Sequence, residues 1–448
     1  MQNRKFGALK CQTPHILTVV GKLEKVVQNR NYCKLAKLKK VKMKKIDFKE
    51  LKAKSWFKYI IIPIIFILGY AFNGLVGNKF TEWFDNKFAE GDKYVAVIIT
   101  NKTDESFTIP QEFRKGFGNN GDFKSDNTGQ NIKFIKDDDA LSEKQAELLA
   151  DKYVNDPNCV LIIGNSTSSL TEVTLNRILK TSKENQPSFI LPIATADNIT
   201  DKAMDQNYQG ILRMMPNNEK QAITIKNFIF QKFPKNPKVV IYVDEDNLTY
   251  SENLSQQISD KIIRSKGTIV LKKNYGNSNR LINDYHLLFN RNSNDKIRIS
   301  PDIVVFVGIS TNGSLLMEEV NNLKIDIPVI FSDGCTVNNL MRKSQNNINH
   351  YFVSAVEKNF NENSTPTYQT VGEDARELAV KILKSVKGDI TKQSVNEYVH
   401  YIRKKQELVL DDGKAGKYVF DNKGENTQMS WKLYHYVDGE LELEYESN

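Results

Sequence analysis

The sequence predicts an α/β protein made of two doubly wound parallel-sheet lobes behind a single N-terminal transmembrane helix. From Tyr94 onward, short β-branched runs alternate with amphipathic segments, which is the strand-helix rhythm of parallel sheets. Before that point, the nineteen residues 59–77 carry no charge, and an apolar stretch of this length spans about 30 Å as a helix.

The N-terminal charge predicts the orientation of this span. Residues 1–58 contain 17 Lys or Arg and three acidic residues, so they carry +14 and the rest of the chain −5 of the total +9. A lysine excess on one side of a span marks the cytoplasmic side. We therefore expect 1–58 to be a basic cytoplasmic tail, 59–78 a transmembrane helix in contact with lipid, and 79–91 a linker. The protein would be a single-pass protein of the cell membrane with an extracytoplasmic ligand-binding domain.

Other interpretations of the N-terminus stay open. A cleaved signal peptide is the main rival, although no small-x-small site follows the apolar run and no cysteine there could carry a lipid. The lysine-rich segment 38–54 could bind anionic lipid or nucleic acid, but we interpret it as the orientation signal and expect no nucleic-acid partner. Met43 lies inside that segment, so the sequence leaves open whether 1–42 are translated.

Four strands are predicted in the first lobe. They are "YVAVIIT" (94–100), "NIKFIKDDD" (131–139), "CVLIIG" (159–164) and "SFILPIAT" (188–195). Between the second and third, residues 142–154 have apolar positions at helical spacing, with Ser142 as the expected N-cap. The unbroken apolar character of 159–164 predicts a strand buried on both faces.

The same pattern repeats in the second lobe. The chain turns at Pro216 into a helix, and strands are predicted at 238–246, 268–276, 302–310 and 327–334. Two sheets of four or five strands fit this series better than one sheet of ten. The division between them is expected near Arg213–Asn217.

Polar residues gather where the predicted strands end. In parallel sheets the carboxyl ends of strands meet helix N-termini, and ligands bind at that edge. The segments selected by this rule are Gly164–Ser169, Ala194–Asp197, Asp244–Tyr250 and Gly308–Gly313, with Asp333 ending a further strand.

The segment "GNSTSS" has two interpretations. Ser169 with Glu172 forms a capping box, which needs no ligand. The hydroxyls of Ser166, Thr167 and Ser168 then remain beside a helix N-terminus, where a carboxylate would bind. Asp333 is likewise either a turn residue or a partner for a cationic ligand group, and Tyr250 either packs on the surface or closes over a ligand.

Catalytic and metal chemistry are poorly supported. No G-x-x-x-x-G-K-[ST] occurs, and "GFGNNG" (116–121) follows a predicted helix rather than a strand. "GNSTS" lacks the second glycine of a nucleophile elbow. Four cysteines and five histidines show no metal-ligand spacing. We expect no cofactor, no metal and no enzyme activity.

Several ordered segments resemble the leucine/isoleucine/valine-binding protein family of type 1 periplasmic binding proteins. They are "VLIIGNSTSS", "PIATADNIT", "GILRMMPNNEKQA", "VIYVDEDNLTYSENLSQQI", "PDIVVFVGIS", "IPVIFSDG" and "GKYVFDNKGE". The resemblance covers roughly residues 92–448. It implies a Venus flytrap, in which two lobes joined by three crossings close on a small molecule. The implied boundaries are 92–213 for the first part of lobe I, 214–335 for the first part of lobe II, 336–390 for the return of lobe I, and 391–448 for the return of lobe II and the C-terminus.

The resemblance also implies roles for particular residues. Ser168 and Thr195 correspond to the hydroxyls that bind the ligand carboxylate, with the backbone of Ile193 alongside. Tyr250 corresponds to the aromatic lid, and Asp333 to the acid that pairs with the ligand ammonium. This chain has Asp where the family has Glu, and Ser310 with Thr311 where an aromatic is usual, so its side-chain specificity is expected to differ.

The function expected from these observations is a membrane-anchored solute-binding protein that captures an amino acid or similar small zwitterion for an ABC-type permease. The main alternative is a ligand-sensing receptor module that signals through a partner chain. An exported enzyme is the third.

Overall fold

The computed structural model describes residues 92–102, 108–118, 122–125, 129–276, 279–284, 288, 300–336, 338–344, 349–356, 368–437 and 440–446. The expected tail, transmembrane helix and linker, residues 1–91, lie outside the described residues. Within those described, no helix has both the length and the apolar character needed to cross a membrane.

The first lobe is built on a sheet whose described strands number six, in the order β2-β3-β1-β4-β5-β6. All pair in parallel except β2, which is antiparallel to β3. Every residue of β4 is buried, which confirms that its apolar run is covered on both faces. The strands are β1 (Lys93–Ile98), β2 (Phe123–Lys124), β3 (Asn131–Asp137), β4 (Cys159–Gly164), β5 (Ser188–Leu191) and β6 (Ile211–Arg213).

Helices connect these strands. Helix α6 begins after Ser142, whose side chain accepts the N–H of Gln145 as an N-cap, as the sequence predicts. Because right-handed crossovers that move in one direction along a sheet lie on the same face, α6 packs beside α7 and α7 beside α8. The helices are α5 (Thr108–Phe117), α6 (Glu143–Asn155), α7 (Ser168–Leu179) and α8 (Asp197–Asp205).

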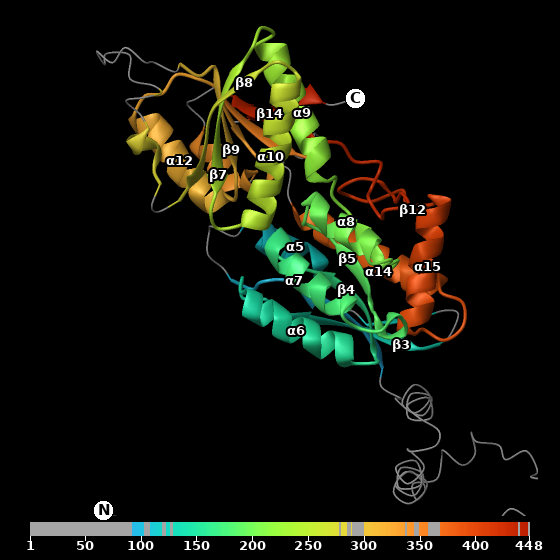
Figure 1. The fold of residues 1–448 in the computed structure, drawn as a ribbon. Coiled ribbons are helices and arrows are strands. Elements are labelled where there is room, and N and C mark those ends of the chain that lie inside the picture. Colours follow the sequence, from blue (N-terminus) through green and yellow to red (C-terminus); the bar gives the residue numbers. More distant parts are fainter. Residues whose placement is uncertain are drawn as a thin grey trace, which may run out of the picture. The chain divides into compact units, whose positions relative to one another are not determined.

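The second lobe has a sheet of seven described strands in the order β15-β14-β11-β10-β9-β7-β8. Figure 1 shows α10 and α12 on opposite faces of this sheet, as expected for a doubly wound arrangement. The strands are β7 (Lys238–Asp244), β8 (Thr268–Tyr275), β9 (Ile303–Val307), β10 (Val329–Phe331), β11 (His350–Ser354), β14 (Lys432–Val437) and β15 (Glu440–Glu446). Its helices include α9 (Asn218–Lys232), α10 (Leu248–Arg264), α12 (Ser310–Asn322), α13 (Asn338–Lys343) and the short 3₁₀ turn η6 (Asp333–Cys335).

Both sheets are larger and more mixed than the sequence predicts. The expected four or five parallel strands become six and seven among the described residues. The additions are the parallel strands β6 and β11 and the antiparallel strands β2, β14 and β15. The hairpin β14–β15 is the largest addition, and β14 pairs with β11. Its strands follow the last helix and belong to no strand-helix unit, so the βαβ rhythm does not reveal them.

The return segments also differ from the expected boundaries. Residues 336–390 were assigned to the first lobe, but β11 lies in the second sheet, where it pairs with β10. Residues 391–448 were assigned to the second lobe, but α15 (Lys392–Lys405) packs against β4 and β5. Helix α14 (Tyr368–Ser385) packs on α5, and a two-stranded sheet of β12 (Leu408–Leu410) and β13 (Tyr418–Val419) follows α15. The sequence of an amphipathic helix does not show which sheet the helix covers. The sequence therefore could not assign the two return segments to a lobe.

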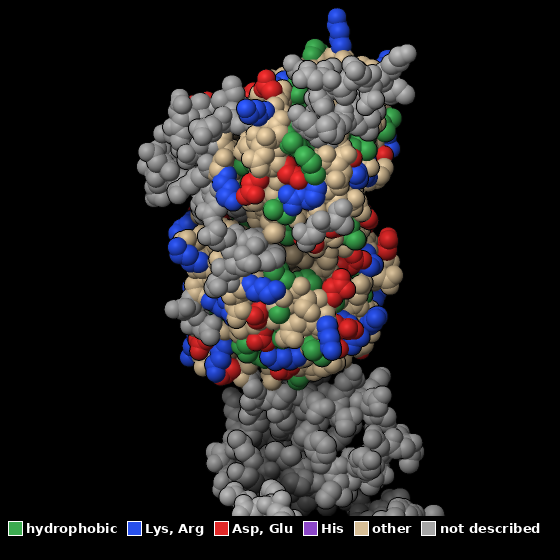
Figure 2. All heavy atoms as spheres, turned by 90° about the vertical axis from the view of Figure 1, so that its left-hand side faces the viewer, with side chains coloured by type: hydrophobic (Ala, Val, Ile, Leu, Met, Phe, Trp, Pro, Cys, Tyr) green, Lys and Arg blue, Asp and Glu red, His purple; other side chains and the backbone are tan. Residues whose placement is uncertain are grey.

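Charges are dispersed over the surface. On the face shown in Figure 2, Lys and Arg side chains are interspersed with Asp and Glu among the described residues. This mixture fits the small net charge of the chain beyond its basic N-terminus.

Two connections between the sheets lie side by side. Strand β6 ends at Arg213 and α9 begins at Asn218, so residues 214–217 link the sheets. The segment before β14 returns along the same path: the backbone N–H of Asn426 donates to Arg213 O at 3.2 Å, and Trp431 Nε1 donates to Asn217 O at 3.0 Å.

A buried ion pair holds this crossing. Arg213, which is 0% exposed, lies with its Nε 3.1 Å from Glu425 Oε2. Its other nitrogens donate to Ala194 O at 2.8 Å and to Ala196 O at 2.7 Å. Thr200 Oγ1 donates to Glu425 Oε1 at 2.6 Å. The guanidinium therefore ties the crossing to the segment that follows β5.

Replacing Glu425 by Ala should lower the free energy of unfolding by about 3–5 kcal/mol, because a buried guanidinium would lose its counter-charge. Urea denaturation of the purified protein measures this loss. The matched control is Asp201→Ala, which removes an exposed ion pair with Lys423 and should change stability far less. Equal effects of the two substitutions would contradict a structural role for the buried pair.

Candidate functional site

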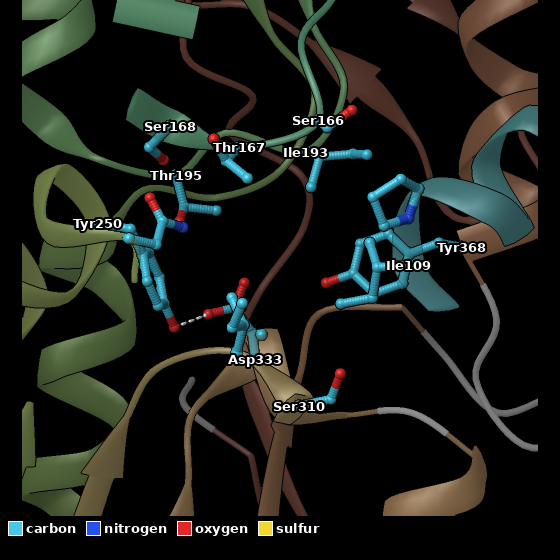
Figure 3. A pocket seen from close by; sticks show the side chains of 14 residues that line it. Ile109, Ser166, Thr167, Ser168, Ile193, Thr195, Tyr250, Ser310, Asp333 and Tyr368 are labelled. Carbon is cyan, nitrogen blue, oxygen red and sulfur yellow. Dashed lines mark hydrogen bonds between the residues drawn. The ribbon is translucent and has the colours of Figure 1, made fainter. Parts of the chain in front are cut away.

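A pocket lies where the carboxyl ends of the two sheets meet (Figure 3). Its volume is about 60 Å³. Since one water needs about 10–15 Å³, the pocket has room for roughly four to six waters, or one small organic molecule. The first lobe contributes Ile109, Pro110, Ser166, Thr167, Ser168, Ile193, Thr195 and Tyr368, and the second lobe Asn247, Tyr250, Ile309, Ser310, Asp333 and Gly334.

The N-cap of α7 is Thr167, and the expected capping box of Ser169 with Glu172 is wrong. Thr167 Oγ1 accepts the N–H of Leu170 at 3.3 Å. Ser169 instead donates its hydroxyl to Asn247 Oδ1 at 3.0 Å, and Glu172 accepts from Lys202 Nζ at 2.6 Å. Among several adjacent hydroxyls, the residue that begins the helix is decided by where the strand ends.

The hydroxyl groups of residues 166–168 make different contacts. Ser166 Oγ accepts the backbone N–H of Thr100 at 2.8 Å, and its own N–H donates to Asp139 Oδ2 at 3.0 Å, so Ser166 fixes the loop. Ser168 is the first residue of α7 and only 3% exposed, and it lines the pocket. Its position at a helix N-terminus favours a negatively charged ligand group.

The segment after β5 completes this side of the pocket. Thr195 and Ile193 both line it, and Thr195 is 1% exposed. The carbonyls of Ala194 and Ala196, on either side of Thr195, are the groups that accept from Arg213. The buried ion pair thereby sets the position of Thr195.

Asp333 lies on the opposite side, in the second lobe. Tyr250 Oη donates a short hydrogen bond to Asp333 Oδ1, and Gln221 Nε2 donates to the same oxygen at 2.8 Å. Figure 3 shows the other carboxylate oxygen turned toward the pocket. Within the described residues, no Lys, Arg or His forms an ion pair with Asp333.

Burial dominates the electrostatics of this acid. Desolvation raises the pKa of Asp333, and the hydrogen bonds from Tyr250 and Gln221 oppose that rise. Burial and the neighbouring carboxylate raise the pKa of Tyr250 well above its usual value, so its hydroxyl remains a donor. A cationic ligand group beside Asp333 would supply the missing counter-charge.

The remaining walls are mainly apolar. Ile109 and Pro110 come from α5, Ile309 precedes α12, and Tyr368 is the first residue of α14. The sequence analysis did not identify Ile109, Pro110 or Tyr368, because α5 and α14 reach the pocket only through the packing of the two helices. Ile309 lies within the selected segment Gly308–Gly313. Ser310, which the sequence did single out, also lines the pocket as the first residue of α12.

Hydrogen bonds link the two lobes beside the pocket. Besides the Ser169–Asn247 bond, the N–H of Glu219 donates to Asp197 Oδ1 at 3.3 Å, and Thr249 Oγ1 donates to Glu172 Oε2 at 3.5 Å. The first and second lobes are therefore in contact along this edge.

Comparison with known proteins agrees with this architecture. No protein-family profile matches the chain. The Leu/Ile/Val-binding protein of Escherichia coli K12 is 26% identical over 193 residues, which are 42% of this chain and 48% of that protein. An amino acid binding protein of Pseudomonas aeruginosa is 24% identical over 47% of this chain and 52% of its own length. The chain is a relative of the leucine/isoleucine/valine-binding proteins. It spans about half the length of the curated relatives that it matches.

Solved structures extend the likeness in fold. The branched-chain amino acid transporter substrate-binding protein LivJ of Streptococcus pneumoniae, in complex with isoleucine, has a TM-score of 0.62 at 15% identity and covers 80% of this chain and 100% of its own. A solute-binding protein of R. palustris in complex with benzoate has a TM-score of 0.61 at 15% identity, over 80% of this chain and 96% of its own. These relatives and neighbours are named as binding proteins rather than enzymes.

All six site residues expected from the sequence line this one pocket: Ser168, Ile193, Thr195, Tyr250, Ser310 and Asp333. The structure shows their proximity, and their roles toward a ligand stay predictions. Asn247 lies within the selected segment Asp244–Tyr250 but was not singled out, and Tyr368 and Gln221 are additions that only the fold reveals.

Glu112 positions Tyr368 and should give the protein a measurable pH dependence. Its Oε2 accepts the backbone N–H of Tyr368 at 2.9 Å, and burial raises the pKa of Glu112 to about 7 from a usual 4.5. A raised carboxyl pKa means that the folded state holds the proton more tightly, so stability falls as pH rises from about 4.5 through 7.

Glu112→Gln keeps the acceptor without the charge. Above pH 8 it should be roughly 1–3 kcal/mol more stable than the wild type, with little difference below pH 4.5. Denaturation of the variant and the wild type across this pH range measures the difference in stability. A difference that does not change with pH would contradict the raised pKa of Glu112.

Proposed function

We propose that the chain is a membrane-anchored extracytoplasmic solute-binding protein that captures an amino acid or similar small zwitterion for an ABC-type permease. The observation that carries the proposal is the buried carboxylate of Asp333, which forms no ion pair within the described part of the chain and faces Ser168 and Thr195 across one pocket. An α-amino acid presents a carboxylate and an ammonium group on one carbon, which complements hydroxyls at a helix N-terminus and an acid opposite.

The energetics of such a site suit reversible capture. Charge-assisted hydrogen bonds contribute about 1.5–3 kcal/mol each, and part of that gain is offset by the entropy lost on binding. Two or three such bonds with one ion pair give roughly micromolar affinity. The apolar walls would receive a short side chain.

The known relatives support a transport role. The E. coli relative is named for leucine, isoleucine and valine, and the structural neighbour from S. pneumoniae is named as a branched-chain amino acid transporter substrate-binding protein. The benzoate complex shows that a similar fold is also found with a carboxylate that has no ammonium group. The acid at Asp333 is therefore the feature of this chain that favours an amino acid over a simple carboxylate.

Standard L-amino acids should raise the melting temperature of the purified protein selectively. Stabilisation follows RT ln(1 + [L]/Kd), about 2.7 kcal/mol at a ligand concentration of 100 Kd. Thermal-shift screening against amino acids, simple carboxylates, sugars and nucleosides measures it. Stabilisation by a sugar or nucleoside and by no amino acid would overturn the proposed ligand class.

Asp333→Asn is the matched test of the charge. It keeps the size of the side chain and should weaken amino-acid binding by at least about tenfold, because the ligand ammonium would lose its counter-charge. The control is Asp260→Asn, on α10 and away from the pocket, which should bind as the wild type does. Isothermal titration gives both affinities, and an unchanged affinity for Asp333→Asn would refute the ion pair.

The proposed anchor rests on the uncharged residues 59–77 and the lysine excess before them. Full-length protein expressed in a bacterial host should sediment with membranes and resist extraction by salt and carbonate, while a chain that begins at residue 79 should not. A mature N-terminus near residue 78 would instead show a cleaved signal peptide.

A further inference from the structure

Gln221 is a buried residue whose side-chain amide contacts Asp333 outside the pocket lining. It lies in the first turns of α9 and is 0% exposed. Its Nε2 donates to Asp333 Oδ1 at 2.8 Å, and its Oε1 accepts the backbone N–H of Asp333 at 3.4 Å. One side chain thus binds both the carboxylate and the backbone of the same residue.

An amide suits this pair of bonds. The Asp333 N–H needs an acceptor and its ionised carboxylate needs a donor, and the Gln221 amide carries both groups at its end. A carboxylate at position 221 would face Asp333 with like charge, and an aliphatic side chain would leave a buried N–H unpaired.

The helix that carries Gln221 is well fixed. Asn217 caps α9 by accepting the N–H of Lys220 at 3.1 Å, and its own carbonyl accepts from Trp431 Nε1 at 3.0 Å. Gln221 therefore projects from a rigid element that begins at the crossing between the lobes. Polar groups held in this way orient the residue that contacts the ligand.

The direction of the bonds determines which oxygen of Asp333 is available. Tyr250 and Gln221 both donate to Oδ1, and the other oxygen is turned toward the pocket (Figure 3). Without Gln221, the carboxylate would lose the donor that α9 supplies and would keep Tyr250 and the backbone N–H of Gly334 as partners. Gln221 is therefore the donor that ties the orientation of the carboxylate to α9.

We propose that Gln221 is a positioning residue that sets the selectivity of the site for ligands with an ammonium group, by holding Asp333 with one oxygen directed at the ligand. The inference rests on the proposed function and deepens it. Gln221 is absent from the pocket lining and acts only through Asp333.

The test compares L-valine with 3-methylbutanoate, which has the same carbon skeleton and carboxylate but no ammonium group. Gln221→Met keeps the length of the side chain and removes both hydrogen bonds. Its affinity for valine should fall by about tenfold, while its affinity for 3-methylbutanoate stays within about twofold of the wild type. Titration of both ligands in the wild type and the variant gives the ratio.

Thr224→Val is the matched control. Thr224 lies one turn further along α9, is fully buried, and bonds only to Lys220 O of its own helix, at 3.0 Å. Its substitution should leave the ratio of the two affinities unchanged. Gln221→Glu is a second variant, which keeps the acceptor but loses the donor at neutral pH, and it should lose at least as much selectivity for valine.

The outcomes separate the two levels of the proposal. If neither valine nor any other amino acid binds the wild type, the proposed function fails. If valine binds and the Gln221 variants weaken both ligands equally, or neither, Gln221 is a packing residue and this inference is overturned while the function stands.

Discussion

The ion pair between Arg213 and Glu425 is the constraint on which the rest of the structure depends. It joins the end of β6, the segment after β5 and the segment that returns toward β14, three parts of the chain that are far apart in sequence. A guanidinium with several carbonyl and carboxylate acceptors tolerates full burial, whereas an unpaired one does not. The same contacts that hold the crossing also position Thr195 at the pocket.

The pocket combines two electrostatic environments separated by a few side chains. On the first lobe, hydroxyls and helix N-termini favour negative charge, as at Ser168. On the second lobe, a desolvated carboxylate favours positive charge, as at Asp333. Because each lobe carries one of these environments, only contact between the lobes brings both to a single pocket. Gln221 connects the second half to the helix that starts at the crossing.

Much of the fold could be predicted from local pattern. The predicted strands 159–164, 238–246 and 302–310 each contain a continuous apolar run, and burial on both faces is the physical reason for that pattern. The corners that follow them were recognisable because parallel strands end at one edge. The antiparallel strands β14 and β15 and the placement of α15 could not be inferred, since the sequence shows which face of an element is apolar but not which sheet covers it.

The sequence by itself determined the chemistry available at each corner: which hydroxyls, which acid and which aromatic side chain stand at the ends of strands. Only the tertiary structure decided which of them meet. Thr167 rather than Ser169 caps α7, Ser169 bonds across to Asn247, and Gln221 and Tyr368 come to the site from helices whose sequences do not mark these two positions. The physical reason is that hydrogen bonds and burial depend on distances between segments far apart in the chain, and those distances are set by the packing of the two sheets.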